Sequence, residues 1–227
     1  QGPAKRDVDA DGLLVTPGWV DVHTHYDGQA MWDPLLSPSC WHGVTSVVLG
    51  NCGVTFAPCK PEDREYLAEL MESVEDIPKR SILDGLPWDW ETYGEYLASL
   101  ERMPKGINAG GMVGHCAVRY AAMGPRSLDE APAKPDDVAR ICAHVDEAIA
   151  AGALGFSTSR THAHRSRDGL NIGTLTAEDP ELLGVASALR KTGKGVIQLI
   201  SDAYLTADDA FANAELQLIR RLAETSG

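Results

Sequence analysis

The sequence has little of what marks several classes of protein. It contains 20 basic against 33 acidic residues, a formal net charge of −13, and no basic stripe with interleaved aromatic residues. We therefore expect no nucleic-acid partner. No apolar run approaches the ~20 residues that a helix needs to cross a bilayer, and no segment with the pattern of a signal peptide opens the chain. We expect no membrane partner.

Cysteine is also scarce. The five cysteines are an odd number and are scattered over 227 residues, which is not the pattern of a disulfide framework. We therefore expect a reducing compartment and a cytoplasmic protein. A Gly-x-Gly-x-x-Gly segment is missing after the first predicted strand, which argues against a dinucleotide-binding fold. Since 44% of the residues are hydrophobic, a chain of this length can bury a core within one domain.

What the sequence does contain is a regular alternation of two kinds of segment. Runs rich in apolar and β-branched residues predict strands over 19–25, 43–53, 107–115, 153–159 and 195–201. Apolar residues at helical spacing predict helices over 62–77, 90–100, 136–151, 176–193 and 206–227. This order predicts an α/β fold with a parallel sheet. Because five strand–helix units are visible and a barrel of eight takes about 250 residues or more, we expect a partial (β/α)8 TIM-like barrel rather than an open doubly wound sheet.

Two histidines lie one residue apart at the end of the first predicted strand, in "WVDVHTHYDG". Side chains two residues apart share a face of a strand, and active sites of such barrels lie at the carboxyl ends of the strands. His23 and His25 therefore suit a divalent metal such as zinc. Cys52 ends the second strand, in "GNCG", at the same level. Each group alone also fits a solvated turn or a small buried residue, but together they predict a metal site.

Four segments resemble one known family. "LLVTPGWVDVHTHYDGQ", "HGVTSVVLGNCGVTFAP", "GGMVGHCAVRYAAMG" and "AGALGFSTS" are similar to the amidohydrolase superfamily, and specifically to its D-aminoacylase (N-acyl-D-amino-acid deacylase) branch. The resemblance implies a (β/α)8 barrel with a small β-sandwich and metal binding by His23, His25 and Cys52. It also implies that residues 1–16 link a mostly missing N-terminal β-sandwich to the barrel, and that residues 17–227 are the N-terminal part of that barrel.

One segment departs from the family pattern. The family supplies a histidine ligand from the fifth strand, in a segment resembling "THxR", whereas this chain has "GVIQLISD". Gln198, Ser201 and Asp202 stand there, and Asp202 could substitute as a ligand. We therefore expect one or two Zn²⁺ ions. The resemblance places the remaining ligands and the general base, an aspartate of the eighth strand, beyond Gly227.

The sequence has five other histidines. His115 ends the third predicted strand and is a weak candidate for the substrate pocket, where it could polarise a carbonyl; a structural hydrogen bond is the alternative. His162 and His164 form a second His-x-His in a polar stretch, which favours a solvated loop that could line the mouth of the barrel. His42 precedes the second strand, at the wrong end of a barrel, and His144 lies within a predicted helix. Neither is expected to be functional.

The resemblance implies a metal-dependent hydrolase that cleaves a non-peptide C–N amide bond with a metal-activated water. The expected partner is a small-molecule N-acyl amino acid, and an oligomer is compatible with the sequence. Two alternatives stay open: another amidohydrolase, such as a cyclic amidase of the hydantoinase or dihydroorotase type, and a non-catalytic barrel module. We expect the 227 residues alone to be inactive, because the general base would lie outside them.

Overall fold

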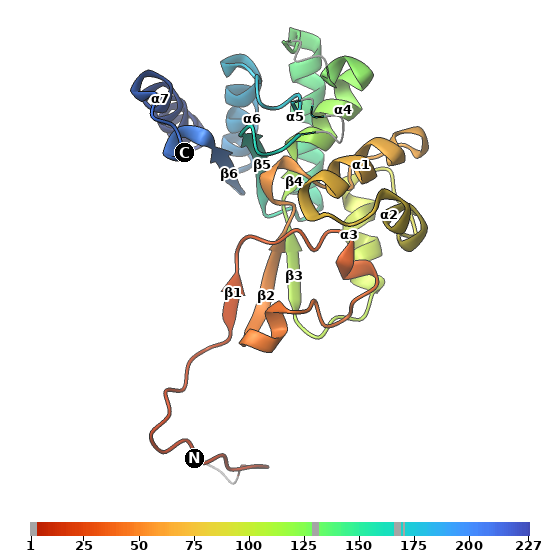
Figure 1. Ribbon diagram of the computed structural model, residues 1–227, viewed down its shortest axis with the longest axis vertical. Coiled ribbons are helices and arrows are strands. Elements are labelled where there is room, and N and C mark those ends of the chain that lie inside the picture. Colours follow the sequence, from red (N-terminus) through yellow and green to blue (C-terminus); the bar gives the residue numbers. More distant parts are fainter. Residues whose placement is uncertain (1–3, 129–131, 166–168, 170) are drawn as a thin grey trace.

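The computed structural model describes residues 4–128, 132–165, 169 and 171–227. Its strands form two parallel three-stranded sheets, with the orders β1-β2-β3 and β4-β5-β6 (Figure 1). The strands are β1 (Trp19–Asp21), β2 (Val44–Leu49), β3 (Asn108–Gly111), β4 (Val113–Gly114), β5 (Gly155–Arg160) and β6 (Val196–Ser201). The expected α/β fold with parallel strands is confirmed. Among the described strands β1, β3, β4 and β6 each pair on one side only, so the two sheets do not close into a barrel.

In the part of the chain that the structure describes, seven α-helices connect and follow these strands. They are α1 (Arg64–Glu75), α2 (Lys79–Gly85), α3 (Tyr93–Arg102), α4 (His115–Met123), α5 (Pro135–Ala151), α6 (Asp179–Thr192) and α7 (Asp209–Ser226). Short 3₁₀ turns are η1 (Gln29–Met31), η2 (Ser39–His42), η3 (Asn51–Gly53), η4 (Pro61–Asp63), η5 (Gly124–Leu128) and η6 (Asp202–Tyr204). Within the described residues, no helix combines the length and the apolar character needed to cross a membrane.

The helix ends follow from local sequence. Thr92 caps α3 in a capping box, in which its hydroxyl accepts the Glu95 amide and the Glu95 carboxylate accepts the Thr92 amide. Gly193 ends α6 in the left-handed conformation, as the sequence predicts. The two last helices begin later than expected. α6 starts at Asp179 and not near 176, and α7 starts at Asp209 and not at 206, with Asp208 capping it through its side chain.

The third predicted strand differs most from the structure. It is broken at Met112, where the chain passes from the first sheet to the second. The Met112 amide still donates to the Leu49 carbonyl of β2, at 3.0 Å, whereas Leu154 donates to Gly111 from the other side. His115 then begins α4 and does not end a strand. β1 is also shorter than expected, since it ends at Asp21, although the chain stays extended beside β2 and the Thr24 amide still donates to the Val48 carbonyl.

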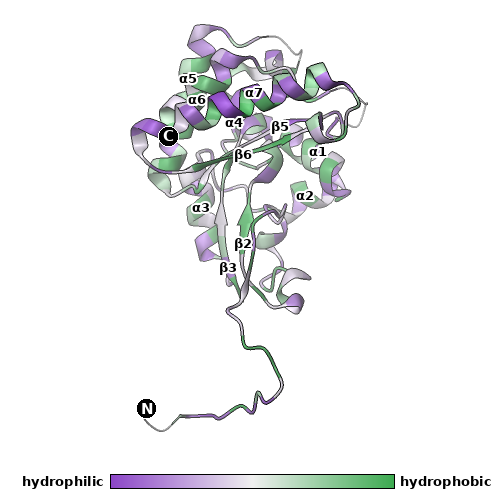
Figure 2. Ribbon diagram, turned by 90° about the vertical axis from the view of Figure 1, so that its left-hand side faces the viewer, coloured by the Kyte–Doolittle hydropathy of each residue, from purple (hydrophilic) through white to green (hydrophobic). Residues whose placement is uncertain are grey.

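The main core lies between the strands and helices α1 to α6. Its largest fully buried side chains include Phe56, Tyr96, Leu49, Ile141 and Phe156. Figure 2 shows β2 as an apolar strand, whereas hydrophilic and hydrophobic residues alternate along α7. Val47 and Leu49 are the buried residues of β2, and the pattern of α7 is that of a helix with one solvent face.

The N-terminal segment extends away from β1 (Figure 1). Residues 11–20 are all exposed, and Leu14 retains 89% of its accessible surface. Residues 1–3 lie outside the described part. That residues 1–16 link a β-sandwich to the barrel stays a prediction.

Candidate metal centre

The structure brings His23, His25 and Cys52 together. One donor atom from each lies within 4.8 Å of the others, and Cys52 Sγ is 3.2 Å from His23 Nε2. The two imidazole rings are 5.5 Å apart between centroids and meet edge to face. The histidines follow β1 and the cysteine follows β2, at the carboxyl ends of two paired parallel strands. Nitrogen and sulfur donors of this kind match the ligands that zinc prefers.

Thr24 fixes the direction of the two histidines. Its amide donates to the Val48 carbonyl of β2 at 3.1 Å, and its hydroxyl donates to the same carbonyl at 2.8 Å. Thr24 is buried against β2, so the residues on either side of it point the other way. His23 and His25 therefore share the face on which Cys52 lies.

The cysteine sits in a tight left-handed loop. Gly50 (φ 73°), Cys52 (φ 56°) and Gly53 (φ 74°) all adopt positive φ. A Cβ atom at Gly50 would come far closer to the Met112 carbonyl oxygen than the 3.0 Å that real Cβ atoms keep, so only glycine fits there. Cys52 has no such freedom, and a left-handed conformation costs an ordinary residue about 1–2 kcal/mol. Contacts around the loop must offset that cost.

Buried polar side chains supply these contacts on the β1 side. The Asn51 amide group donates to the carbonyls of Thr24 (3.1 Å) and Val48 (2.9 Å). The Gly50 amide donates to Asp27 Oδ2 at 3.1 Å. Asp27 is fully buried, and burial foremost raises the pKa of its carboxyl to about 7. The motif after the second histidine therefore anchors the cysteine loop.

Two further contacts come from distant strands, and sequence reasoning did not find them. The Cys52 amide donates to Gln198 Oε1 of β6 at 2.9 Å, and the Gly53 amide donates to Ser157 Oγ of β5 at 2.9 Å. Ser157 Oγ also donates to the Gly50 carbonyl. In the sequence, Gln198 stood out only because a histidine was expected nearby.

The protonation states of His25 and Cys52 are compatible with binding of a cation. Burial, and then the charges of His23 and His164, lower the pKa of His25 to about 4, so its imidazole is neutral at neutral pH. His25 Nδ1 is buried without a hydrogen-bond partner among the described residues. Burial raises the pKa of the Cys52 thiol to about 12, so the thiol keeps its proton until a cation displaces it. An unpartnered nitrogen beside a second imidazole and a thiol fits a bound metal ion.

His115, our weak candidate for the substrate pocket, is a fully buried core residue. It begins α4, is fully buried, and both its ring nitrogens have partners. Nε2 lies 2.7 Å from Glu181 Oε1, and Nδ1 lies 2.8 Å from Thr158 Oγ1. The Arg119 guanidinium donates to the same Glu181 oxygen at 2.9 Å. Because no ring nitrogen is left to reach a substrate, the structural alternative describes this histidine.

Asp202 does not join the donors described above. Its carboxylate accepts the Thr161 hydroxyl and, at 2.8 Å, the His162 amide. Burial raises its pKa, but these hydrogen bonds and the charges of His162 and His164 outweigh burial and hold the pKa below its usual value. Asp202 therefore ties the loop after β5 to the end of β6. The expectation that it replaces the missing histidine finds no support in the geometry.

The two histidines of the second His-x-His, His162 and His164, have different surroundings. His162 is exposed, whereas His164 is half-buried and its Nδ1 lies 2.6 Å from Ser159 Oγ. Burial, and next the charge of His23, lower the pKa of His164. His164 is therefore close enough to His23 for the two charges to interact. A cavity of about 430 Å³ opens beside this loop, and its lining includes His162, Asp202 and Phe211.

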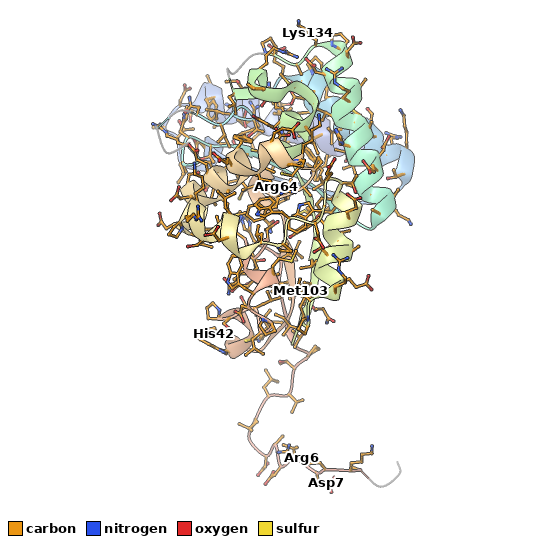
Figure 3. All side chains as sticks on the ribbon, turned by 90° about the vertical axis from the view of Figure 1, so that its right-hand side faces the viewer. Arg6, Asp7, His42, Arg64, Met103 and Lys134 are labelled. Atoms are coloured by element: carbon orange, nitrogen blue, oxygen red, sulfur yellow. The ribbon has the colours of Figure 1, made fainter. Side chains whose placement is uncertain are left out.

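The remaining histidines lie away from the mouth. His42 precedes β2 at the amino end of the strand, on the side of the molecule nearest the N-terminal segment (Figure 3). His144 is on α5, 3.9 Å from Glu147. Both positions agree with the expectation that neither histidine takes part in the site.

The sequence is similar to those of known amidohydrolases. A family model described as "Amidohydrolase family" matches residues 6–227. The D-aminoacylase of Alcaligenes xylosoxydans xylosoxydans is 33% identical over 160 residues, which are 70% of this chain and 30% of that protein. The N-acyl-D-aspartate deacylase of the same organism is 36% identical over 155 residues, 66% of this chain and 28% of that protein. This chain thus spans less than a third of these curated relatives.

Solved structures of D-aminoacylase-type enzymes have a similar fold. A D-aminoacylase studied for its binuclear metal centre superposes with a TM-score of 0.67 at 27% identity, over 92% of this chain and 38% of that one. The N-acyl-D-glutamate deacylase of Bordetella bronchiseptica, complexed with zinc and a phosphonate inhibitor, gives a TM-score of 0.59 at 26% identity, over 81% of this chain and 33% of that one. The chain therefore belongs to the amidohydrolase family, in its D-aminoacylase branch.

Proposed function

We propose that this chain carries part of the active site of a metal-dependent hydrolase that deacylates N-acyl-D-amino acids. The observation that carries the proposal is the convergence of His23, His25 and Cys52 within 4.8 Å. It occurs in a chain that is 33% and 36% identical to a D-aminoacylase and an N-acyl-D-aspartate deacylase. The linear amide substrate and the D configuration come to the proposal from these relatives.

The three residues would hold the ion in complementary ways. His25 offers a neutral nitrogen, since its pKa of about 4 keeps it unprotonated at neutral pH. Cys52 gives up its proton when the ion binds, so metal affinity should rise with pH. Thr24 and Asn51 keep both segments in place through the Val48 carbonyl. A bound divalent ion would supply the acidity that turns water into a nucleophile near neutral pH.

We propose zinc as the ion, because one imidazole pair and one thiolate suit it and a structural neighbour is complexed with zinc. The three donors account for one ion. Asp202, the candidate for a second, has its carboxylate engaged by Thr161 and His162. We also propose that residues 1–227 alone do not turn over substrate, because the family resemblance expects further ligands and the general base outside them.

Metal content tests the proposal. Full-length protein, its Cys52→Ala variant and a Cys142→Ala control are purified without chelators, and metal per chain is measured by mass spectrometry. Cys142 is a half-buried thiol on α5 and is not among the donors. We expect equal zinc in wild type and control, and most of it lost in Cys52→Ala, together with deacylation of N-acyl-D-amino acids. Hydantoin hydrolysis instead would favour a cyclic amidase, and wild type without metal would favour a non-catalytic module.

A further inference from the structure

The loop that carries Cys52 rests on a row of three neighbouring strands. Ser157 pairs with Gly114 of β4 on one side and with Gln198 of β6 on the other. The loop lies close above this row: a Cβ atom at Gly114 would come within 2.6 Å of the Gly53 carbonyl oxygen. Glycine therefore gives the loop room on β4, and the next two strands present polar side chains to it.

The side chains of Ser157 and Gln198 accept hydrogen bonds from two consecutive backbone amides of the loop. Ser157 Oγ accepts from Gly53, and Gln198 Oε1 accepts from Cys52, each at 2.9 Å. The Cys52 amide thus donates to a side chain of β6 and not to a neighbouring carbonyl. Because Cys52 is a non-glycine residue at φ 56°, its peptide relaxes toward negative φ if that hydrogen bond is lost. Such a rotation would carry Sγ away from His23 Nε2, from which it is 3.2 Å distant.

We propose that Gln198 is a positioning residue for the metal site, acting through the Cys52 amide and not as a ligand. The inference rests on the proposed metal-dependent function. In this chain β6 contributes to the centre by orienting a ligand that belongs to the loop after β2. The requirement at position 198 is an acceptor oxygen of the right reach, which both glutamine and glutamate provide.

Cobalt substitution tests this role with a signal that comes from the cysteine itself. Full-length metal-free protein is titrated with Co²⁺, and the thiolate-to-cobalt charge-transfer absorption is recorded with the Co²⁺ dissociation constant from chelator competition. The variants are Gln198→Leu, which lacks the acceptor, Gln198→Glu, which keeps it, and Gln217→Leu, the same change on the exposed face of α7. Gln198→Met, a flexible side chain of similar length, replaces the leucine variant should that one not fold.

Loss of a residue that orients a ligand typically weakens metal binding by 10–100-fold. We expect a weakening of about that size for Gln198→Leu or Gln198→Met, with a reduced charge-transfer band. Gln198→Glu and Gln217→Leu should match wild type or bind more tightly. Unchanged affinity and band in Gln198→Leu would overturn the role of Gln198 alone, and so would a Gln198→Glu variant as weak as Gln198→Leu. A wild-type protein that binds no Co²⁺ through a thiolate would overturn the proposed function and this inference together.

Discussion

The close approach at Gly50 allows a quantitative prediction for alanine substitution at two glycines. Gly50 (φ 73°) and Gly193 (φ 63°) have nearly the same left-handed backbone. A Cβ atom at Gly193 would meet nothing within 4 Å, whereas at Gly50 it would collide with the Met112 carbonyl. The pair therefore separates the conformational effect of a substitution from its steric effect.

The expected losses of unfolding free energy differ by several-fold. Gly193→Ala should cost about 1 kcal/mol, the usual penalty for placing alanine at positive φ. Gly50→Ala adds a backbone shift that disturbs two buried hydrogen bonds, from Met112 to Leu49 at 3.0 Å and from Gly50 to Asp27 at 3.1 Å. Since leaving a buried polar group unpaired costs about 1–3 kcal/mol, we expect a total of about 4 kcal/mol for Gly50→Ala.

Urea denaturation followed by tryptophan fluorescence measures both losses on the same protein without metal. The dependence of unfolding free energy on urea concentration should be the same in both variants, and their urea midpoints should differ. A second readout is Co²⁺ affinity, which should fall in Gly50→Ala because the loop that holds Cys52 moves, and stay unchanged in Gly193→Ala. Equal losses of about 1 kcal/mol in both variants would refute the close contact between Gly50 and Met112.

Three other substitutions have defined outcomes in the same urea assay. Thr92→Ala removes the capping box of α3 and should cost about 1 kcal/mol, with Thr92→Ser restoring most of it. Glu215→Gln leaves the largely buried Arg160 without its bidentate carboxylate partner and should cost about 3 kcal/mol of unfolding free energy. The control Asp84→Asn breaks the exposed pair with Arg80 and should change that free energy by less than ~0.5 kcal/mol. Glu181 has a pKa held below 4.5 in the folded state, so its contribution is present above pH 4.5 and is lost as the pH falls through the lower folded value. The stability difference between wild type and Glu181→Gln should therefore shrink on acidification; a constant difference would contradict the assignment.

The donors could be predicted because they follow local rules. His23 and His25 are spaced by the period of a strand, and Cys52 follows the next strand of a parallel pair, so their convergence needs only the strand order. The contact between Cys52 and Gln198 could not be predicted in this way. It spans 146 residues and depends on a turn at positive φ and on the register between β5 and β6, neither of which leaves a periodic signal in the sequence.

Helix α4 shows a second reason why sequence reasoning fails. Seven of its nine residues are buried, among them His115, Cys116 and Val118. A helix buried on nearly all sides has no alternation of polar and apolar faces, so its sequence continues the apolar pattern of the strand before it. This is why His115 was expected at the end of a strand and is found instead in a buried helix, bound to Glu181.

The anchoring of the cysteine loop also has a consequence for the order of folding. The donors lie within residues 23–52, but the Gly53 and Cys52 amides donate to Ser157 and Gln198, which lie 104 and 146 residues further along. Contacts of such sequence separation form late, because a long chain segment must be closed first. On the ribosome, the nascent chain would therefore expose two histidines and a thiol well before β6 emerges to orient them. The loop of the proposed metal site is therefore held in place only after β5 and β6 have folded.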